Sequence, residues 1–139
     1  MRNALAKARA AATPGRLVLG ADTEVFLDGE LFGKPADEAQ ARRFLEALSA
    51  RTHEVFTGLA LLDGDREQTG VERTAVTFRP LNATAIDTYL ETGEWRGRAG
   101  GYAVQGHGED LVAAIDGDYW NVVGLPTSLL LALRPDLKP

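Results

Sequence analysis

Short apolar runs alternate with glycine, proline and acidic residues along the chain, and this spacing predicts strands mixed with helices. The Asp28-Gly29 pair lies between two β-prone segments and predicts a hairpin, because both residue types tolerate the positive φ angles of a tight turn. The first strand is expected to end in the small and polar residues Gly20-Ala21-Asp22-Thr23. Strands are predicted at residues 17–19, 25–27, 30–32, 54–62, 71–78, 111–115 and 119–123.

Apolar positions at helical spacing predict the helices. The clearest helix covers residues 37–50, where Phe44, Leu45 and Leu48 form one apolar face. Other helices are predicted at residues 3–12, at 83–92 after the cap residue Asn82, and after Pro126, which suits a first helical turn. Because hairpins accompany the alternation of strands and helices, we expect an α/β fold in which helices flank a mixed β-sheet.

Length and composition describe an ordinary globular chain. Its 139 residues, of which 45% are hydrophobic and 25% charged, suit one domain covering residues 1–139. The absence of cysteine excludes a disulfide scaffold, a thiol nucleophile and a thiolate metal site. The longest apolar run, residues 129–133, is too short to cross a membrane. A net charge of −5 argues against a nucleic-acid polymer as partner.

The charge is unevenly distributed between the start of the chain and the rest. Residues 1–21 carry four basic residues and no acidic one, which leaves 11 basic against 20 acidic residues elsewhere. An acid-free start rich in alanine and arginine is compatible with an organellar transit peptide. A surface helix explains it better, because transit peptides are usually richer in serine.

Two carboxylates near the first strand are candidates for chemistry. Asp22 and Glu24 stand two residues apart, so they share one face if the strand continues. Paired carboxylates can hold a hard divalent cation such as Mg²⁺. A purely structural role for Asp22, in which its carboxylate accepts turn hydrogen bonds, also fits the position.

Two further segments can bind anions or bases. Lys34 lies in a rigid Gly-Lys-Pro turn that could present a point charge to a phosphate, although the P-loop pattern is absent. The glycine-dense segment 96–108 contains Arg96 and Arg98 and could wrap an anion through backbone N–H groups. Within it, the amide of Gln105 can read a base edge with a donor and an acceptor. An ordinary surface loop is the simpler interpretation of this segment.

The histidines and serines exclude two common classes of site. His53 and His107 lack the spacing of a zinc site, and His53 is expected to brace a turn between a helix and a strand. Neither Ser49 nor Ser128 stands in a nucleophile elbow, which argues against a Ser/His/Asp hydrolase.

The ordered motifs of the chain resemble a known family. The matching segments are Gly20-Ala21-Asp22-Thr23, Gly33-Lys34-Pro35, 38–49, 51–58, 76–81, 99–106 and 117–126. Each is weak alone, but their order and spacing are similar to the Maf family of nucleoside triphosphate pyrophosphatases, also called septum-formation inhibitors. The resemblance implies an α/β architecture like that of Maf and inosine triphosphatase proteins, a cytoplasmic location and a homodimer.

The resemblance also implies an activity and roles for single residues. Family members cleave a nucleoside triphosphate between the α and β phosphates, and the motif forms here are similar to the branch acting on dTTP and UTP. By this resemblance Asp22 accepts the proton of the attacking water or helps hold Mg²⁺ or Mn²⁺, with Glu24 as a further ligand. Lys34 and Lys7 would face the phosphates. Thr23 and Gln105 match positions that tune base choice.

One family motif does not occur in this sequence. Relatives carry an early Ser-x-Ser-Pro-Arg-Arg loop whose serine and arginines are expected to grip the phosphates, and here the first predicted helix already resembles the later lysine-bearing one. We therefore expect that about forty residues of a strand, loop, helix and connector are missing and that activity is impaired. The alternatives are a non-catalytic nucleotide-binding regulator of cell division and a degenerate, inactive fragment.

Overall fold

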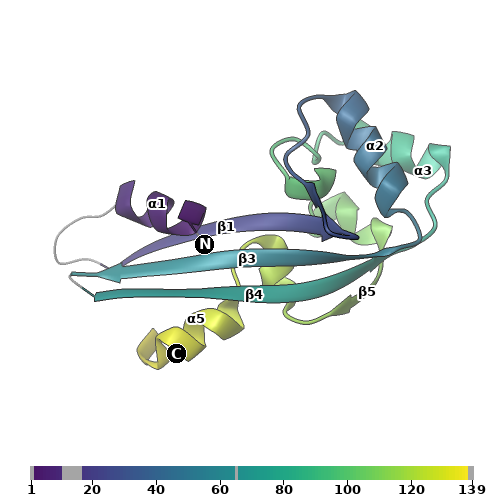
Figure 1. Cartoon of the computed structure of the whole chain (residues 1–139). Coiled ribbons are helices and arrows are strands. Elements are labelled where there is room, and N and C mark those ends of the chain that lie inside the picture. The colour runs from purple at the N-terminus through teal and green to yellow at the C-terminus, as the bar shows by residue number, and fades with distance from the viewer. Residues whose placement is uncertain (1, 11–16, 65, 138–139) are drawn as a thin grey trace. The chain divides into compact units, whose positions relative to one another are not determined.

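The computed structural model describes residues 2–10, 17–64 and 66–137, which contain a five-stranded antiparallel sheet flanked by helices (Figure 1). The strand order is β2-β1-β3-β4-β5. The strands are β1 (Leu17–Leu27), β2 (Glu30–Phe32), β3 (Thr52–Asp63), β4 (Arg66–Phe78) and β5 (Val112–Asp116). The helices are α1 (Arg2–Ala10), α2 (Glu38–Leu48), α3 (Ala83–Glu91), α4 (Tyr119–Val123) and α5 (Thr127–Leu133). Short 3₁₀ helices cover η1 (Ala99–Gly101), η2 (Gly106–Leu111) and η3 (Pro135–Leu137).

The chain divides into two compact units, and β1, β3 and β4 each contribute residues to both. The first unit lies within residues 1–23, 56–73 and 118–139, and the second comprises residues 24–55 and 74–117. No helix in the described part of the chain is long and apolar enough to span a membrane.

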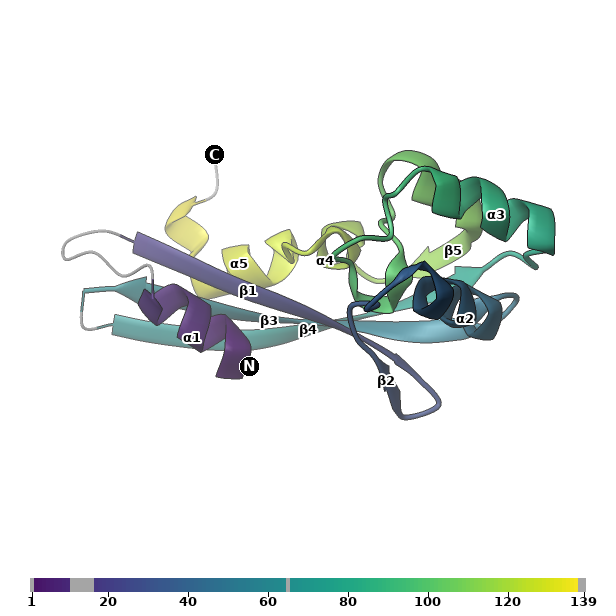
Figure 2. The same ribbon diagram turned by 90° about the horizontal axis from the view of Figure 1, so that it is seen from above.

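The first unit places helices on both faces of its strands. Figure 1 shows α1 and α5 on opposite faces, and the view from above in Figure 2 agrees. Ala4 and Ala8 on α1 are fully buried against Ala60 on β3. The other helix, α5, packs on β4, where a Cβ added to Gly70 would lie 2.9 Å from a methyl group of Leu129. Small residues therefore let both helices approach the sheet closely.

We expect Gly20→Ala to destabilise the chain by about 1–3 kcal/mol, because overpacking against backbone forces the helix to shift. A Cβ on Gly20 would overlap the Ala4 carbonyl oxygen and lie 2.7 Å from the Ala8 nitrogen. The control is Gly33→Ala, whose Cβ would meet nothing within 4 Å, and neither glycine has a positive φ. Urea unfolding should separate the two variants, and equal stabilities would contradict the packing of α1 on Gly20.

The second unit is built on α2 and α3, which pack side by side (Figure 2). Its hairpin pairs Val25 with Phe32, and its turn residues Asp28 and Gly29 have φ angles of 52° and 80°. The cap of α2 is Asp37, which accepts a hydrogen bond from the Gln40 N–H at 2.8 Å. The cap of α3 is Asn82, which accepts from Ala85 N–H at 2.8 Å. The buried side chains of the two helices are Ala41, Leu45, Leu48, Ile86, Tyr89 and Leu90.

Most predicted elements are confirmed, including the α/β class with flanking helices, the hairpin and the helices at 37–50, 83–92 and after Pro126. The sheet was expected to be mixed, and in the structure it is antiparallel. The predicted helix at 3–12 matches α1, although residues 11 and 12 lie outside the described residues. The prediction that residues 20–23 leave the first strand is wrong, because β1 continues through them to Leu27. Asp22 therefore lies within a strand and not in the loop after one.

The strand predicted at residues 119–123 is also wrong, because these residues form α4. Tyrosine, tryptophan and valine favour strands, but the flanking residues specify a helix. The Asp118 carboxylate accepts the Trp120 N–H at 2.9 Å and caps the helix. At the other end, Gly124 adopts a φ of 117° and terminates it.

Candidate functional site

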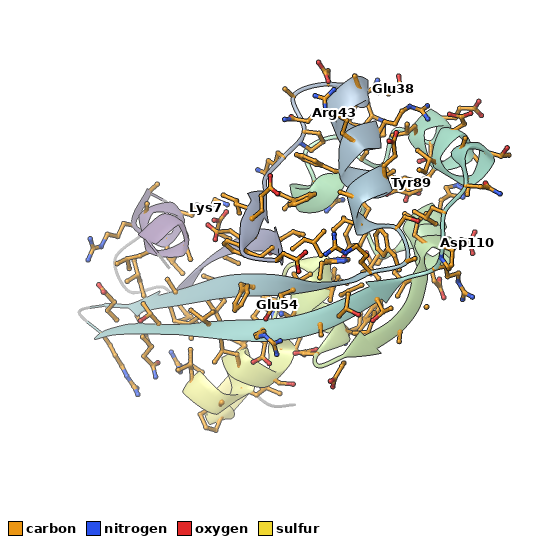
Figure 3. All side chains as sticks on the ribbon, turned by 45° about the vertical axis from the view of Figure 1, so that its right-hand side comes forward. Lys7, Glu38, Arg43, Glu54, Tyr89 and Asp110 are labelled. Atoms are coloured by element: carbon orange, nitrogen blue, oxygen red, sulfur yellow. The ribbon has the colours of Figure 1, made fainter. Side chains whose placement is uncertain are left out.

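In the first unit, an ion pair joins two of the predicted site residues. Lys7 projects from α1 (Figure 3), and its Nζ lies 2.8 Å from Asp22 Oδ1 on β1. The same ammonium donates to the Ala21 carbonyl oxygen at 3.2 Å. A second ion pair, Arg9–Glu67 at 3.0 Å, ties α1 to β4. The Lys7 side chain is 53% exposed and that of Asp22 17%, so the pair borders solvent and a ligand can reach the ammonium.

Thr23 occupies a different environment from its neighbour Asp22. Consecutive strand residues point to opposite faces, and the Thr23 Oγ1 lies 2.9 Å from the Oγ1 of the fully buried Thr57. The Thr57 hydroxyl donates its single proton to the Asn121 carbonyl oxygen at 3.1 Å, so Thr23 must donate to Thr57. Thr23 is therefore held by an internal hydrogen bond on the face that carries α4.

Sequence reasoning did not identify Thr57 or Asn121. Asn121 is fully buried, and its side-chain Nδ2 donates to the Glu72 carbonyl oxygen on β4 at 3.2 Å. The two residues are separated by 64 positions, and no local pattern connects them. The signal in the sequence was a polar threonine within an apolar, strand-forming run.

In the second unit, a backbone hydrogen bond brings two other predicted residues onto neighbouring loops. The Gly100 N–H donates to the Gly33 carbonyl oxygen at 3.1 Å, so the turn that carries Lys34 lies against the loop that carries Gln105. Both side chains are exposed, and within the described residues neither makes an ion pair or a side-chain hydrogen bond. A cation and an amide are thus available to a ligand.

The carboxylates suggested for a metal are Asp22 and Glu24, both on β1 and both half-buried. Asp22 is assigned to the first unit and Glu24 to the second. No group of three or more histidine, aspartate or glutamate side chains suited to a metal occurs among the residues described. Mg²⁺ is commonly held by one or two carboxylates together with substrate phosphates and waters, so either carboxylate is of the donor type that such an ion prefers.

His53 is buried, and its hydrogen bond and ring contacts join it to the glycine-rich loop and to β4. It lies at the start of β3 with 1% exposure, and its Nε2 lies 2.7 Å from the Tyr102 hydroxyl. The rings of Phe78 and Tyr102 stand edge-on to the imidazole, with centroids 5.0 and 5.5 Å away. Burial lowers the pKa of His53 to about 4, and burial raises the pKa of Tyr102 above its usual range. His53 therefore stays neutral and fixes the glycine-rich loop to β3.

The candidate site residues thus form two groups, one in each unit. Lys7 and Asp22 touch in the first unit, and Thr23 points to the other face of the same strand. Lys34 and Gln105 lie on joined loops in the second unit. The first unit thus contributes Asp22 with Lys7, and the second contributes Lys34 with Gln105, while Glu24 follows on β1 in the second unit.

Comparison of the whole sequence with known proteins finds relatives of the same family that the motifs resemble. A dTTP/UTP pyrophosphatase of Symbiobacterium thermophilum is 54% identical over 127 residues, which cover 90% of this chain and 66% of the relative. That of Pyrococcus furiosus is 48% identical over 120 residues, covering 86% and 63%. That of Deinococcus radiodurans is 46% identical over 128 residues, covering 92% and 66%.

The chain therefore spans slightly less than two thirds of the length of these curated relatives. The profile of the family described as Maf-like protein matches residues 1–135, which is nearly the whole chain. The same residues include the Asp22–Lys7 pair and the joined loops of Lys34 and Gln105. On this match, the chain belongs to the Maf family.

Proposed function

We propose that the protein hydrolyses nucleoside triphosphates, dTTP and UTP among them, to the nucleoside monophosphate and pyrophosphate. The observation that carries the proposal is the contact between the Lys7 ammonium and the Asp22 carboxylate at 2.8 Å. A carboxylate able to accept a proton and an ammonium able to bind a phosphate therefore lie side by side. The names of the relatives support the same activity and the same substrates.

The proposed reaction is an attack of water on the α-phosphorus. The water oxygen forms a bond to the α-phosphorus, its proton passes to the Asp22 carboxylate, and the bond from the α-phosphorus to the bridging oxygen breaks. Pyrophosphate leaves with the electron pair of that bond. Because little covalent chemistry is required of the protein, positioning and charge neutralisation supply most of the rate. By the family resemblance, Lys7 and Lys34 would neutralise phosphate oxygens and the Gln105 amide would contact the base.

In the alternative role of Asp22, its carboxylate and that of Glu24 are the groups that would hold Mg²⁺ or Mn²⁺. When bound, such a cation offsets phosphate charge, which a protein with a net charge of −5 needs locally. The homodimer and the cytoplasmic location implied by the resemblance belong to the same proposal.

The test is incubation with UTP or dTTP and Mg²⁺ or Mn²⁺, with chromatography of the products. We expect monophosphate and pyrophosphate in equal amounts and no turnover in chelator. The relative from Symbiobacterium thermophilum serves as a positive control. Release of orthophosphate and nucleoside diphosphate would overturn the assigned bond cleavage. Tight binding without any product would instead favour the non-catalytic regulator of septum formation.

A further inference from the structure

The loop that carries Gln105 is fixed on both sides of that residue. On the N-terminal side, the Ala103 N–H donates to the Tyr89 hydroxyl at 2.9 Å. On the C-terminal side, the His107 and Gly108 N–H groups donate to the Glu94 carboxylate at 3.0 and 3.2 Å. The exposed Gln105 side chain lies between these anchors. Both anchoring side chains come from the end of α3 and the turn that follows it.

Glu94 uses both of its carboxylate oxygens in this contact. Its Oε2 accepts from His107 and its Oε1 from Gly108, so the two bonds define the direction in which the chain leaves Gln105. Hydrogen bonds from backbone amides to a charged acceptor are stronger than those to a neutral one. The half-buried position of Glu94 limits competition from water.

Tyr89 provides the second anchor and is 3% exposed. Burial raises the pKa of Tyr89 to about 12, the nearby Glu94 carboxylate adds to this effect, and the Ala103 amide opposes it. The phenol is therefore neutral at physiological pH and accepts the Ala103 N–H.

Two glycines make the geometry of this loop specific. Gly106 has a φ of 69°, and a Cβ at this position would lie 2.8 Å from the Glu94 Oε2. A Cβ on Gly108 would overlap the Ala103 carbonyl oxygen, so the loop closes directly on itself. Both residues are therefore required for Glu94 to reach the backbone beside Gln105.

We propose that Glu94, assisted by Tyr89, is a positioning residue that orients Gln105 for contact with the nucleobase. This inference rests on the proposed function, in which Gln105 contacts the base. An amide presents one donor and one acceptor edge, and its discrimination between bases depends on where the backbone places it. Without the Glu94 hydrogen bonds, the loop still contains Gln105, but its backbone no longer holds the amide in one orientation.

The test compares base preference, defined as the ratio of kcat/KM for UTP to that for CTP and to that for ATP. We expect Glu94→Ala to lower these ratios about fivefold to tenfold. This is the value of one neutral hydrogen bond, here the bond between the Gln105 amide and the base. Glu94→Gln retains one acceptor oxygen and should fall between Glu94→Ala and the parent protein. Glu91→Ala, which removes an exposed carboxylate from the last position of α3, is the matched control and should change nothing.

A double-mutant cycle separates positioning from a general loss of structure. If Glu94 acts through Gln105, the variant that carries both Glu94→Ala and Gln105→Ala has the base preference of Gln105→Ala alone. A purely structural role for Glu94 would lower kcat/KM for all nucleotides equally and leave the ratios unchanged, which would overturn the inference. So would a Gln105→Ala variant whose base preference matches that of the parent protein.

Two further readouts do not depend on catalysis. Amide hydrogen exchange at His107 and Gly108 should accelerate in Glu94→Ala and not in Glu91→Ala, and unchanged exchange would overturn the anchor itself. Calorimetric dissociation constants for UTP, CTP and ATP give the same base preference without turnover. Binding with the expected preference but no pyrophosphate would refute the proposed catalysis and retain the inference, whereas no binding of any nucleotide would refute both.

Discussion

Replacing Asp22 with asparagine is expected to lower kcat for UTP by a factor of about 10²–10⁴, the usual contribution of a positioned general base. Asparagine has nearly the same shape but cannot accept the proton of the attacking water. Lys7 keeps its hydrogen bond to the Ala21 carbonyl oxygen, so its ammonium should stay in place. The Asp22–Lys7 pair is partly exposed and contributes little to stability, so the fold should tolerate the change.

The measurement is steady-state pyrophosphate release, together with the dissociation constant for UTP. The matched control is Glu67→Gln, which breaks the other ion pair between α1 and the sheet and should leave kcat within a factor of about two. A loss confined to kcat in Asp22→Asn supports its role as base. Equal activity of the two variants would remove Asp22 from the mechanism.

Cap and turn residues in the sequence correctly predicted those helices and hairpins whose ends depend on residues close by in the chain. Asp37 and Asn82 cap helices that begin at the next residue, and Asp28-Gly29 forms the hairpin turn. The same kind of signal was present at Asp118 and Gly124, but the β-prone residues between them outweighed it. A short helix bounded by a good cap and a left-handed glycine overrides strand propensity, because caps satisfy its backbone groups.

The contacts that define the candidate site depend on partners distant in sequence. Lys7 and Asp22 are 15 positions apart, and their pairing requires α1 to pack over Gly20. The Thr57–Asn121 and His53–Tyr102 contacts span 64 and 49 positions. Resemblance to a family identified several of these residues one by one. Only the fold specifies which of them touch, because tertiary packing and not local pattern sets those distances.

His53 provides the second strong prediction, a loss of stability in mild acid. Its pKa is lowered by burial from an ordinary 6.5 to about 4, and its Nδ1 is buried without a hydrogen-bond partner among the described residues. Protonation would place a charge in this apolar site, which is costly. Between these two pKa values the unfolded chain binds more protons than the folded one. This contribution to stability is therefore complete above about pH 6.5 and is lost as the pH falls toward 4.

Lowering the pKa of His53 from 6.5 to about 4 corresponds to a loss of about 3 kcal/mol of stability at acid pH, since each pKa unit corresponds to about 1.4 kcal/mol. Urea unfolding between pH 7 and pH 4 should therefore show a steeper loss in the parent protein than in His53→Gln, because carboxylates titrate in both. An NMR titration of the parent protein tests the same point without a variant, with the exposed His107 as the internal comparison. If the His53 signal titrates near 6.5, the imidazole is not held neutral by burial. The anchor between β3 and the glycine-rich loop would then differ from the structure described.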